Sequence, residues 1–313
     1  MKQTNFFLHI FKIMLFSGIL VATASARAEL KVVTTIKPLH SIISNVMDGI
    51  GEPGLIIDGS ISPHSFTMKP SHAKMLEEAD VIFWIGEGIE TSMEEPLDSI
   101  AKDAEVIEFM ELDSIAKLKF REESIFGDHD DHDDHDDHAG HEGHNHGEFD
   151  AHIWLDPSNA KEMVHEIAHE LGDLDPANKD KYEANAEATI KALDQLISDV
   201  GTDINSDAKF VVFHDAYQYF EERFGVRAAG ALTLNTDVLP GAKQIADIQD
   251  VIKDKGIKCI FSEPQFNPKI ITTIAEDMNI KTGVFDPLGA NIDPGKSLYF
   301  KLISNLGNEL KGY

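Results

Sequence analysis

Two blocks of short apolar segments, separated by a long helical stretch, constrain the fold of this 313-residue chain more than any other feature. The segments are rich in β-branched or aromatic residues and helical patterns lie between them, which is typical of βαβ units with parallel strands. Two α/β units are therefore expected, each with a parallel β-sheet flanked by helices. The segments are 30–36, 54–59, 80–86 and 104–110 in the first block, and 209–215, 257–264 and 281–288 in the second.

The stretch 176–200 between the blocks has the periodicity of one long helix. Pro176 stands where the first turn of a helix tolerates proline, and the 25 residues would span about 37 Å as a rigid connection. We expect an N-terminal lobe over 29–174, a linking helix over 175–205 and a C-terminal lobe over 206–313. Open α/β sheets bind ligands beyond the carboxyl ends of their strands, which favours a site in the cleft between the lobes.

The first 28 residues have the three parts of a secretory signal peptide. Lys2 lies near the start, an apolar stretch follows around residues 13–21, and a small-x-small sequence ends the segment at 26–28. The apolar stretch is short for a membrane span, which needs about 20 residues. We therefore predict a cleavable signal over 1–28, a location in the periplasm and no membrane insertion. The one cysteine, Cys259, is too far from the cleavage position to carry a lipid there.

A run of 20 residues, 128–147, contains seven histidines and seven aspartates and almost nothing apolar. Such a run cannot bury enough apolar surface to offset the entropy of ordering, so we expect a disordered, solvated loop over 127–148. Histidine-rich tracts of this kind are typical of metal binding. The formal charge of −28 also favours cations and argues against nucleic acid as a partner. The candidate ligands in the loop are His129, His132, His135, His138, His141, His144 and His146.

Three isolated histidines lie where a strand or turn is expected to end: His64, His152 and His214. Each of them alone is more often an ordinary hydrogen-bonded histidine near the core. Together they could meet in one cleft, where three neutral imidazoles suit zinc, which prefers tetrahedral nitrogen and sulfur ligation. Asp286, within the last apolar segment, is the candidate for the fourth position. The separations of these residues along the chain are not diagnostic by themselves.

A series of motifs makes the chain resemble the zinc-binding solute-binding proteins of bacterial ABC importers. The motifs are, in order, TTIKPLHSI, SPHSFTMKPS, ADVIFWIGEGIE, AHIWLDP after the histidine-rich run, FVVFHDAYQYFEERFGV, FSEPQF and FDPLGANI. The resemblance implies two α/β lobes joined by a long helix, with one metal ion in the cleft. It also implies His64, His152 and His214 as ligands. Asp286 matches the position that completes the ligand set in many relatives, although some zinc-binding members use water or a glutamate there.

The chain departs from the family pattern at two positions. Pro63 stands where some zinc-binding relatives have a glutamate directly before the first histidine, so a carboxylate is missing at that position. Some relatives also have a disulfide that uses the cysteine matching Cys259, and this chain has no second cysteine. Cys259 is therefore expected to be an inert buried thiol.

The expected function is capture of Zn²⁺, as transported ligand, and its delivery to the permease and ATPase of an ABC importer. The protein is expected to be a monomer and not an enzyme, with an accessory periplasmic zinc carrier as a further candidate partner. Manganese or iron capture is the first alternative; harder cations favour carboxylates, and the manganese-binding relatives have a glutamate where this chain has His214. A periplasmic zinc buffer without a transporter is the second alternative.

The sequence HEIAH at 165–169 matches the helical zinc motif of metallopeptidases and gives a third alternative. The apolar stripe of this helix contains Met163, Val164 and Ile167, and the two histidines fall off that stripe. A catalytic zinc needs its ligands to face a walled cleft. We therefore interpret His165 and His169 as part of a solvated helix face.

Overall fold

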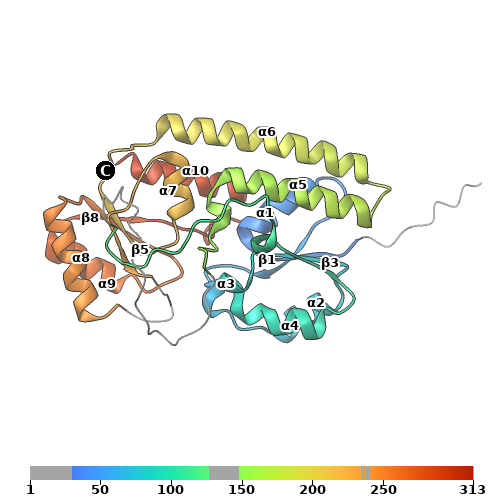
Figure 1. Ribbon diagram of the computed structural model, residues 1–313, viewed down its shortest axis with the longest axis horizontal. Helices are drawn as coiled ribbons and strands as arrows, with labels where there is room; N and C mark the ends of the chain where they lie inside the picture. Colours follow the sequence, from blue (N-terminus) through green and yellow to red (C-terminus); the bar gives the residue numbers. More distant parts are fainter. Residues whose placement is uncertain (1–29, 127–147, 235, 237–239, 313) are drawn as a thin grey trace, which may run out of the picture.

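The computed structural model describes residues 30–126, 148–234, 236 and 240–312. The predicted signal peptide and the histidine-rich run 128–147 lie outside the described residues. The described chain forms two parallel four-stranded sheets with helices around them, as predicted (Figure 1). Within these ranges, every helix is too short or too polar to cross a lipid bilayer.

The first sheet has the strand order β2-β1-β3-β4, and its pairings are parallel. Its strands are β1 (Val32–Ile36), β2 (Gly54–Ile57), β3 (Val81–Trp84) and β4 (Glu105–Glu108). The segments between and after them form α1 (Lys37–Val46), α2 (Pro70–Glu77), α3 (Glu87–Glu90), α4 (Glu94–Ile100) and the 3₁₀ turns η1 (Pro63–Ser65), η2 (Thr91–Met93) and η3 (Phe109–Glu111). Strands β1 and β3 are buried at every residue, as is typical of a parallel sheet covered on both faces.

The second sheet has the strand order β6-β5-β7-β8 and is also parallel. Its strands are β5 (Phe210–His214), β6 (Ala231–Thr233), β7 (Cys259–Ser262) and β8 (Lys281–Val284), and its helices are α7 (Gln218–Phe224), α8 (Ala242–Asp254) and α9 (Lys269–Met278). Strand β6 is absent from the predicted strands because three residues are too few to show a periodicity. The other strands of both sheets lie inside the predicted segments.

Helices α5 (Pro157–Leu174), α6 (Lys179–Asp203) and α10 (Leu298–Leu310) pack together and, with α1, connect the two sheets. In Figure 1, α6 runs along both lobes above α5 and α10. The long helix predicted between the two blocks is thus present, but it begins at Lys179. The expectation that Pro176 lies in its first turn is wrong, because this proline lies in the preceding turn, where Asn178 Nδ2 donates to Asp175 Oδ2 at 2.6 Å.

One apolar core extends from the first sheet through these helices to the inner face of the second sheet. A separate cluster, which includes Val211 and Phe213, fills the space between the outer face of that sheet and helices α8 and α9. Phe210 and Val212 belong to the larger core. Because side chains alternate along a strand, His214 shares their face and stands at the carboxyl end of β5.

Lys37, at the start of α1, joins the two lobes through a buried cluster of hydrogen bonds. Its Nζ atom donates to the backbone carbonyl oxygens of Gly289, Ala290 and Ile292 at 2.8, 3.1 and 2.7 Å. Only 3% of the Lys37 side chain is exposed. The ammonium group of the first lobe therefore fixes the loop after β8 in the second lobe.

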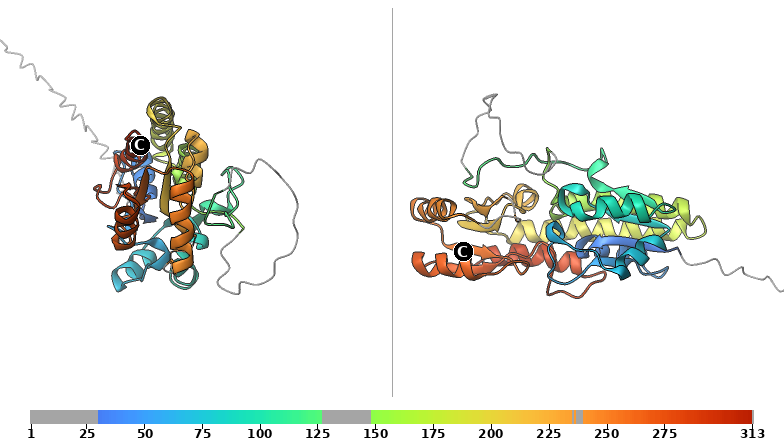
Figure 2. Two further views of the ribbon diagram at one scale, coloured as in Figure 1. Left: turned by 90° about the vertical axis from the view of Figure 1, so that its left-hand side faces the viewer. Right: turned by 90° about the horizontal axis from the view of Figure 1, so that it is seen from below.

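The segments on either side of the histidine-rich run are paired with structured parts of the chain. Lys119 forms an antiparallel bridge with Phe149, and Ile125 forms one with Gly230 beside β6. Figure 2 shows the segment before the run passing from one lobe to the other. Ile125 thus belongs to the predicted N-terminal lobe by sequence and contacts the second sheet. The lobe boundaries at residues 174 and 206 remain a prediction.

Candidate metal centre

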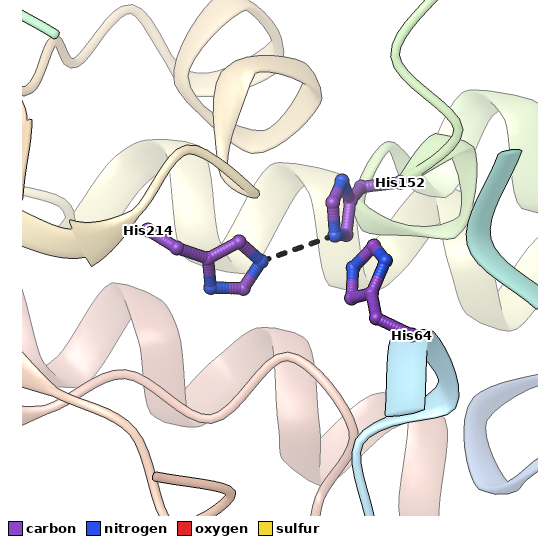
Figure 3. Close-up of side chains that lie close together, drawn as sticks. All are labelled: His64, His152 and His214. Carbon is purple, nitrogen blue, oxygen red and sulfur yellow. Dashed lines mark hydrogen bonds between the residues drawn. The ribbon is translucent and has the colours of Figure 1, made fainter. Parts of the chain in front are cut away.

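Three histidines meet between the two lobes, at the carboxyl ends of their strands (Figure 3). His64 is the middle residue of η1, a turn that starts with Pro63, whose fixed φ suits the first position of a helical turn. His152 directly precedes the 3₁₀ turn η4 (Ile153–Leu155), and His214 is the last residue of β5. Strand ends and tight turns thus bring together three rings from distant parts of the sequence.

The spacing of the imidazole nitrogens fits a small metal ion. One ring nitrogen of each histidine lies within 4.8 Å of those of the other two, and the Nε2 atoms of His152 and His214 are 3.3 Å apart. Tetrahedral zinc, with Zn–N bonds of about 2.0–2.1 Å, needs its nitrogen ligands about 3.3 Å apart. In the part of the chain that the structure describes, no other group of three or more His, Cys, Asp or Glu side chains is placed to hold a metal ion. The structure therefore brings His64, His152 and His214 together as the sequence analysis expects.

Two buried carboxylates orient two of these rings. Asp150 Oδ1 lies 2.7 Å from Nδ1 of His152, and Glu263 Oε1 lies 2.7 Å from Nδ1 of His214. Each carboxylate also accepts from the backbone N–H of the same histidine, at 3.0 and 3.3 Å. Because an ionised carboxylate only accepts hydrogen bonds, Nδ1 of each ring carries a proton and Nε2 faces the centre. Outer partners of this kind are typical of metal-binding histidines.

Burial and mutual repulsion shift the pKa values of these groups. Burial and the neighbouring charge of His214 hold the pKa of His152 well below 6.5. Burial also acts to lower the pKa of His214, but the Glu263 carboxylate outweighs it and raises that pKa. Burial raises the pKa of Asp150 to about 7. Two imidazoles this close do not both become charged, and a neutral ring with its proton on Nδ1 offers the lone pair of Nε2 to a cation.

The three histidines line a small hollow together with Trp154, Glu263 and Gln265. Its volume of about 10 Å³ corresponds to one water-sized sphere. The fully buried indole of Trp154 lies beside His152, with ring centroids 5.3 Å apart, and its Nε1 donates to the Pro287 carbonyl at 2.8 Å. The hollow therefore suits a single ion or water molecule.

Asp286 is half-buried and does not join the three histidines. Its Oδ1 accepts from Gln265 Nε2 at 3.0 Å and from the Leu288 N–H at 3.1 Å, and its Oδ2 accepts from the Ala290 N–H at 2.6 Å. These bonds hold the loop that follows β8. The expected role of Asp286 as a fourth ligand has no support in this geometry and stays a prediction.

A family model described as the periplasmic component A of the zinc-uptake complex matches residues 32–312. The chain belongs to this family. The high-affinity zinc uptake system protein ZnuA of Brucella abortus (strain 2308) is 46% identical over 301 residues, which cover 90% of each chain. The protein of the same name from Yersinia pestis is 33% identical over 302 residues and 95% of each chain. A solved structure of ZnuA has a TM-score of 0.73 at 24% identity, covers 90% of this chain and 98% of that chain, and confirms the fold.

Three polar residues beside the candidate metal centre are missing from the sequence-based prediction: Asp150, Glu263 and Gln265. Asp150 lies two residues before His152, and no apolar segment ends at that point of the sequence. Glu263 follows β7, which pairs directly with β5, so its side chain emerges beside His214. The FSEPQF motif places Glu263 directly after a predicted strand, as His214 is placed in its own motif. Because neighbouring parallel strands end at the same edge of a sheet, this position is the feature that could have indicated their contact.

The histidines of HEIAH lie away from the candidate metal centre. His165 and His169 are exposed on α5, as predicted, while Met163, Val164 and Ile167 of the same helix are buried. His169 Nδ1 lies 3.9 Å from Asp173 Oδ2 on the next turn. These positions are those of a solvated helix face.

Proposed function

We propose that this chain captures one Zn²⁺ ion in the periplasm and delivers it to the permease and ATPase of an ABC importer. His64, His152 and His214 are the protein ligands. The observation that carries the proposal is the 3.3 Å separation of two Nε2 atoms on rings that buried carboxylates hold in place. Neutral imidazoles at this spacing match the ligand type and geometry that zinc prefers. Membership of the zinc-uptake family supports zinc as the cargo.

Asp286 would have to give up three hydrogen bonds to reach the metal. A carboxylate that already accepts from two backbone N–H groups and one amide gains little by moving. We therefore assign three protein ligands and leave the fourth position to a small exchangeable molecule.

Manganese and iron are the alternative cargo within the same family of importers. Both are harder cations and favour carboxylate oxygens, whereas the three ligands proposed here are imidazoles. Calorimetric titration of chelator-stripped protein with Zn²⁺, Mn²⁺ and Fe²⁺ in competition separates these cargoes. Tighter binding of Mn²⁺ than of Zn²⁺ would overturn the zinc assignment.

The remaining parts of the proposal follow from the sequence. The chain is a monomeric binding protein and not an enzyme, it is exported by cleavage near residue 28, and an accessory zinc carrier is a further candidate partner. Neighbouring genes for a permease and an ATPase would separate an importer component from a periplasmic zinc buffer. We assign several weaker zinc sites to the histidines within 128–147, which would raise the zinc concentration beside the cleft.

The ligand assignment is tested by alanine at His64, His152 or His214. Each change should weaken zinc binding at the high-affinity site, which is the tight step of the titration. The loss should exceed the roughly 10–100-fold that follows removal of a residue hydrogen-bonded to a ligand, because here a direct bond to the metal is lost. Isothermal titration of the chelator-stripped protein measures this step, and thermal unfolding of the apoprotein checks that the fold remains.

The matched control is the double variant His165→Ala with His169→Ala, which removes two exposed histidines from α5. Its zinc affinity should equal that of the unchanged protein. Loss of the tight step in this control would move the binding site to the HEIAH helix and refute the assignment.

A further inference from the structure

Gln265, in the loop after β7, lines the same hollow as the three histidines. Its Nε2 donates to Asp286 Oδ1 at 3.0 Å. Its Oε1 is fully buried, and among the described residues it has no hydrogen-bond partner. Buried amide oxygens are nearly always hydrogen-bonded, so this atom indicates a partner that is not part of the protein.

The charge of Asp286 fixes the orientation of the Gln265 amide. A carboxylate only accepts, so the NH₂ group must face Asp286, and the opposite orientation would bring two oxygens within 3.0 Å of each other. Asp286 is itself fixed by the N–H groups of Leu288 and Ala290. The loop after β8 therefore holds Gln265 Oε1 as an acceptor in the wall of the hollow.

The three histidines leave one tetrahedral position of zinc to fill. No carboxylate of the described residues shares their cluster, and Pro63 offers no oxygen from its side chain. The hollow has about 10 Å³ of space, which is that of one water-sized sphere and leaves no room for a bulky fourth ligand. A metal-bound water is a strong hydrogen-bond donor and needs an acceptor, which an amide oxygen provides without adding a second charge.

Water at the fourth position is one of the ligands that the family resemblance already implies. We propose that Gln265 positions this water by accepting a hydrogen bond from it through Oε1. Gln265 is a positioning residue, and Asp286 acts through it by orienting the amide. This inference rests on the proposed zinc site. It gives Asp286 a function in zinc binding that does not require contact with the metal.

Cobalt provides the test, because Co²⁺ takes zinc's place and its visible spectrum reports the number and kind of ligands. Azide added to the Co²⁺-loaded full chain should displace the water and change the spectrum. Gln265→Leu keeps the side-chain volume but removes the acceptor. We expect it to weaken Zn²⁺ binding about tenfold and to shift the azide affinity by several-fold.

Asp286→Asn should reproduce both effects, because an asparagine NH₂ no longer orients the amide of Gln265. The double variant should be no weaker than either single variant, since the two residues act in series. The matched control is the pair Gln195 and Asp199, which form the same Nε2–Oδ1 bond at 2.7 Å on the exposed face of α6. Gln195→Leu and Asp199→Asn should leave zinc affinity and azide response unchanged.

Three results would overturn the inference while leaving the zinc site intact. The first is a wild-type cobalt spectrum that azide does not change. The second is a loss of one cobalt ligand in Asp286→Asn with an unchanged Gln265→Leu, which would make Asp286 a direct ligand. The third is a lower melting temperature of the Gln265→Leu apoprotein with an unchanged azide response, which would show a structural role only. Failure of the proposed function itself appears differently, as wild-type protein without a tight zinc step.

Discussion

At the scale of single residues, Asp150 and Glu263 determine how well two histidines can bind a metal. Asp150→Asn and Glu263→Gln would each place an amide beside Nδ1 of a histidine, and an NH₂ group there favours the wrong tautomer of the ring. We expect zinc affinity to fall about 10–100-fold in either variant. Calorimetry measures the affinity, and nitrogen NMR of the imidazoles reports the tautomer.

The matched control for these variants is Asp175→Asn, at the turn between α5 and α6. Asp175 is also a buried carboxylate, with 9% of its surface exposed, and it accepts from Asn178 far from the histidines. Its replacement should lower stability without changing zinc affinity. Equal losses of affinity in all three variants would show that general destabilisation, and not ring orientation, is responsible.

The sequence predicts the residues that end strands and turns better than it predicts their partners. His64, His152 and His214 are found because each interrupts an apolar or proline-containing segment at a point where chains reverse. Glu263 is not found, because its contact with His214 depends on the register of β5 against β7, which pairs Phe210 with Cys259. Asp286 is a candidate through its place in the last apolar segment and through the resemblance, and its hydrogen bonds with the loop after β8 depend on the folded backbone.

At the scale of secondary-structure elements, α6 stabilises the arrangement of the two lobes. Leu193 on this helix is fully buried in the core that the lobes share. Leu193→Ala should lower the free energy of unfolding by about 2–5 kcal/mol, because a cavity replaces the side chain. Zinc affinity should remain unchanged, since the ligands lie on other elements. Urea unfolding of the apoprotein measures the first quantity and calorimetry the second.

Lys191→Ala is the control on the same helix, because Lys191 is exposed. It should change stability by no more than about 0.5 kcal/mol. A loss from Lys191→Ala as large as that from Leu193→Ala would mean that the loss in Leu193→Ala does not come from the removal of a buried side chain.

Secondary-structure elements are predicted correctly where burial requires a run of apolar residues. They are missed or displaced where the element has few residues or where local hydrogen bonds form a turn. Strands β1 and β3 of the first sheet lie inside predicted segments because parallel strands buried on both faces are rich in apolar residues. β6 has three residues and no such pattern. The start of α6 is displaced to Lys179 because Asn178 and Asp175 form a turn that the helical periodicity does not report.

At the scale of the whole molecule, the tight centre and the histidine-rich run should differ in affinity. A run without apolar residues loses entropy when it closes around each ion, whereas the three cleft histidines are already in position. Deletion of 128–147 should therefore remove several weak zinc sites, keep one tight site, and slow uptake mainly when zinc is scarce. Titration of the deletion variant measures the number of sites.

A second variant, with asparagine in place of the seven histidines of the run, keeps the length of the chain. It should behave like the deletion in titration, because the metal-binding groups are lost in both. Disappearance of the tight step in either variant would make the run itself the principal site and would contradict the three-histidine centre.

The buried ammonium group of Lys37 has a consequence for the rate at which cargo is exchanged. Opening the lobes by a hinge would separate it from three carbonyl partners at once, at about 1.5–3 kcal/mol for each charged hydrogen bond. His64 is the least buried of the three ligands and lies on a turn of three residues. Movement of that turn breaks none of the three Lys37 hydrogen bonds, whose partners lie in the loop after β8. We therefore expect the off-rate of zinc to follow the local opening of this turn, with the lobes still closed on each other.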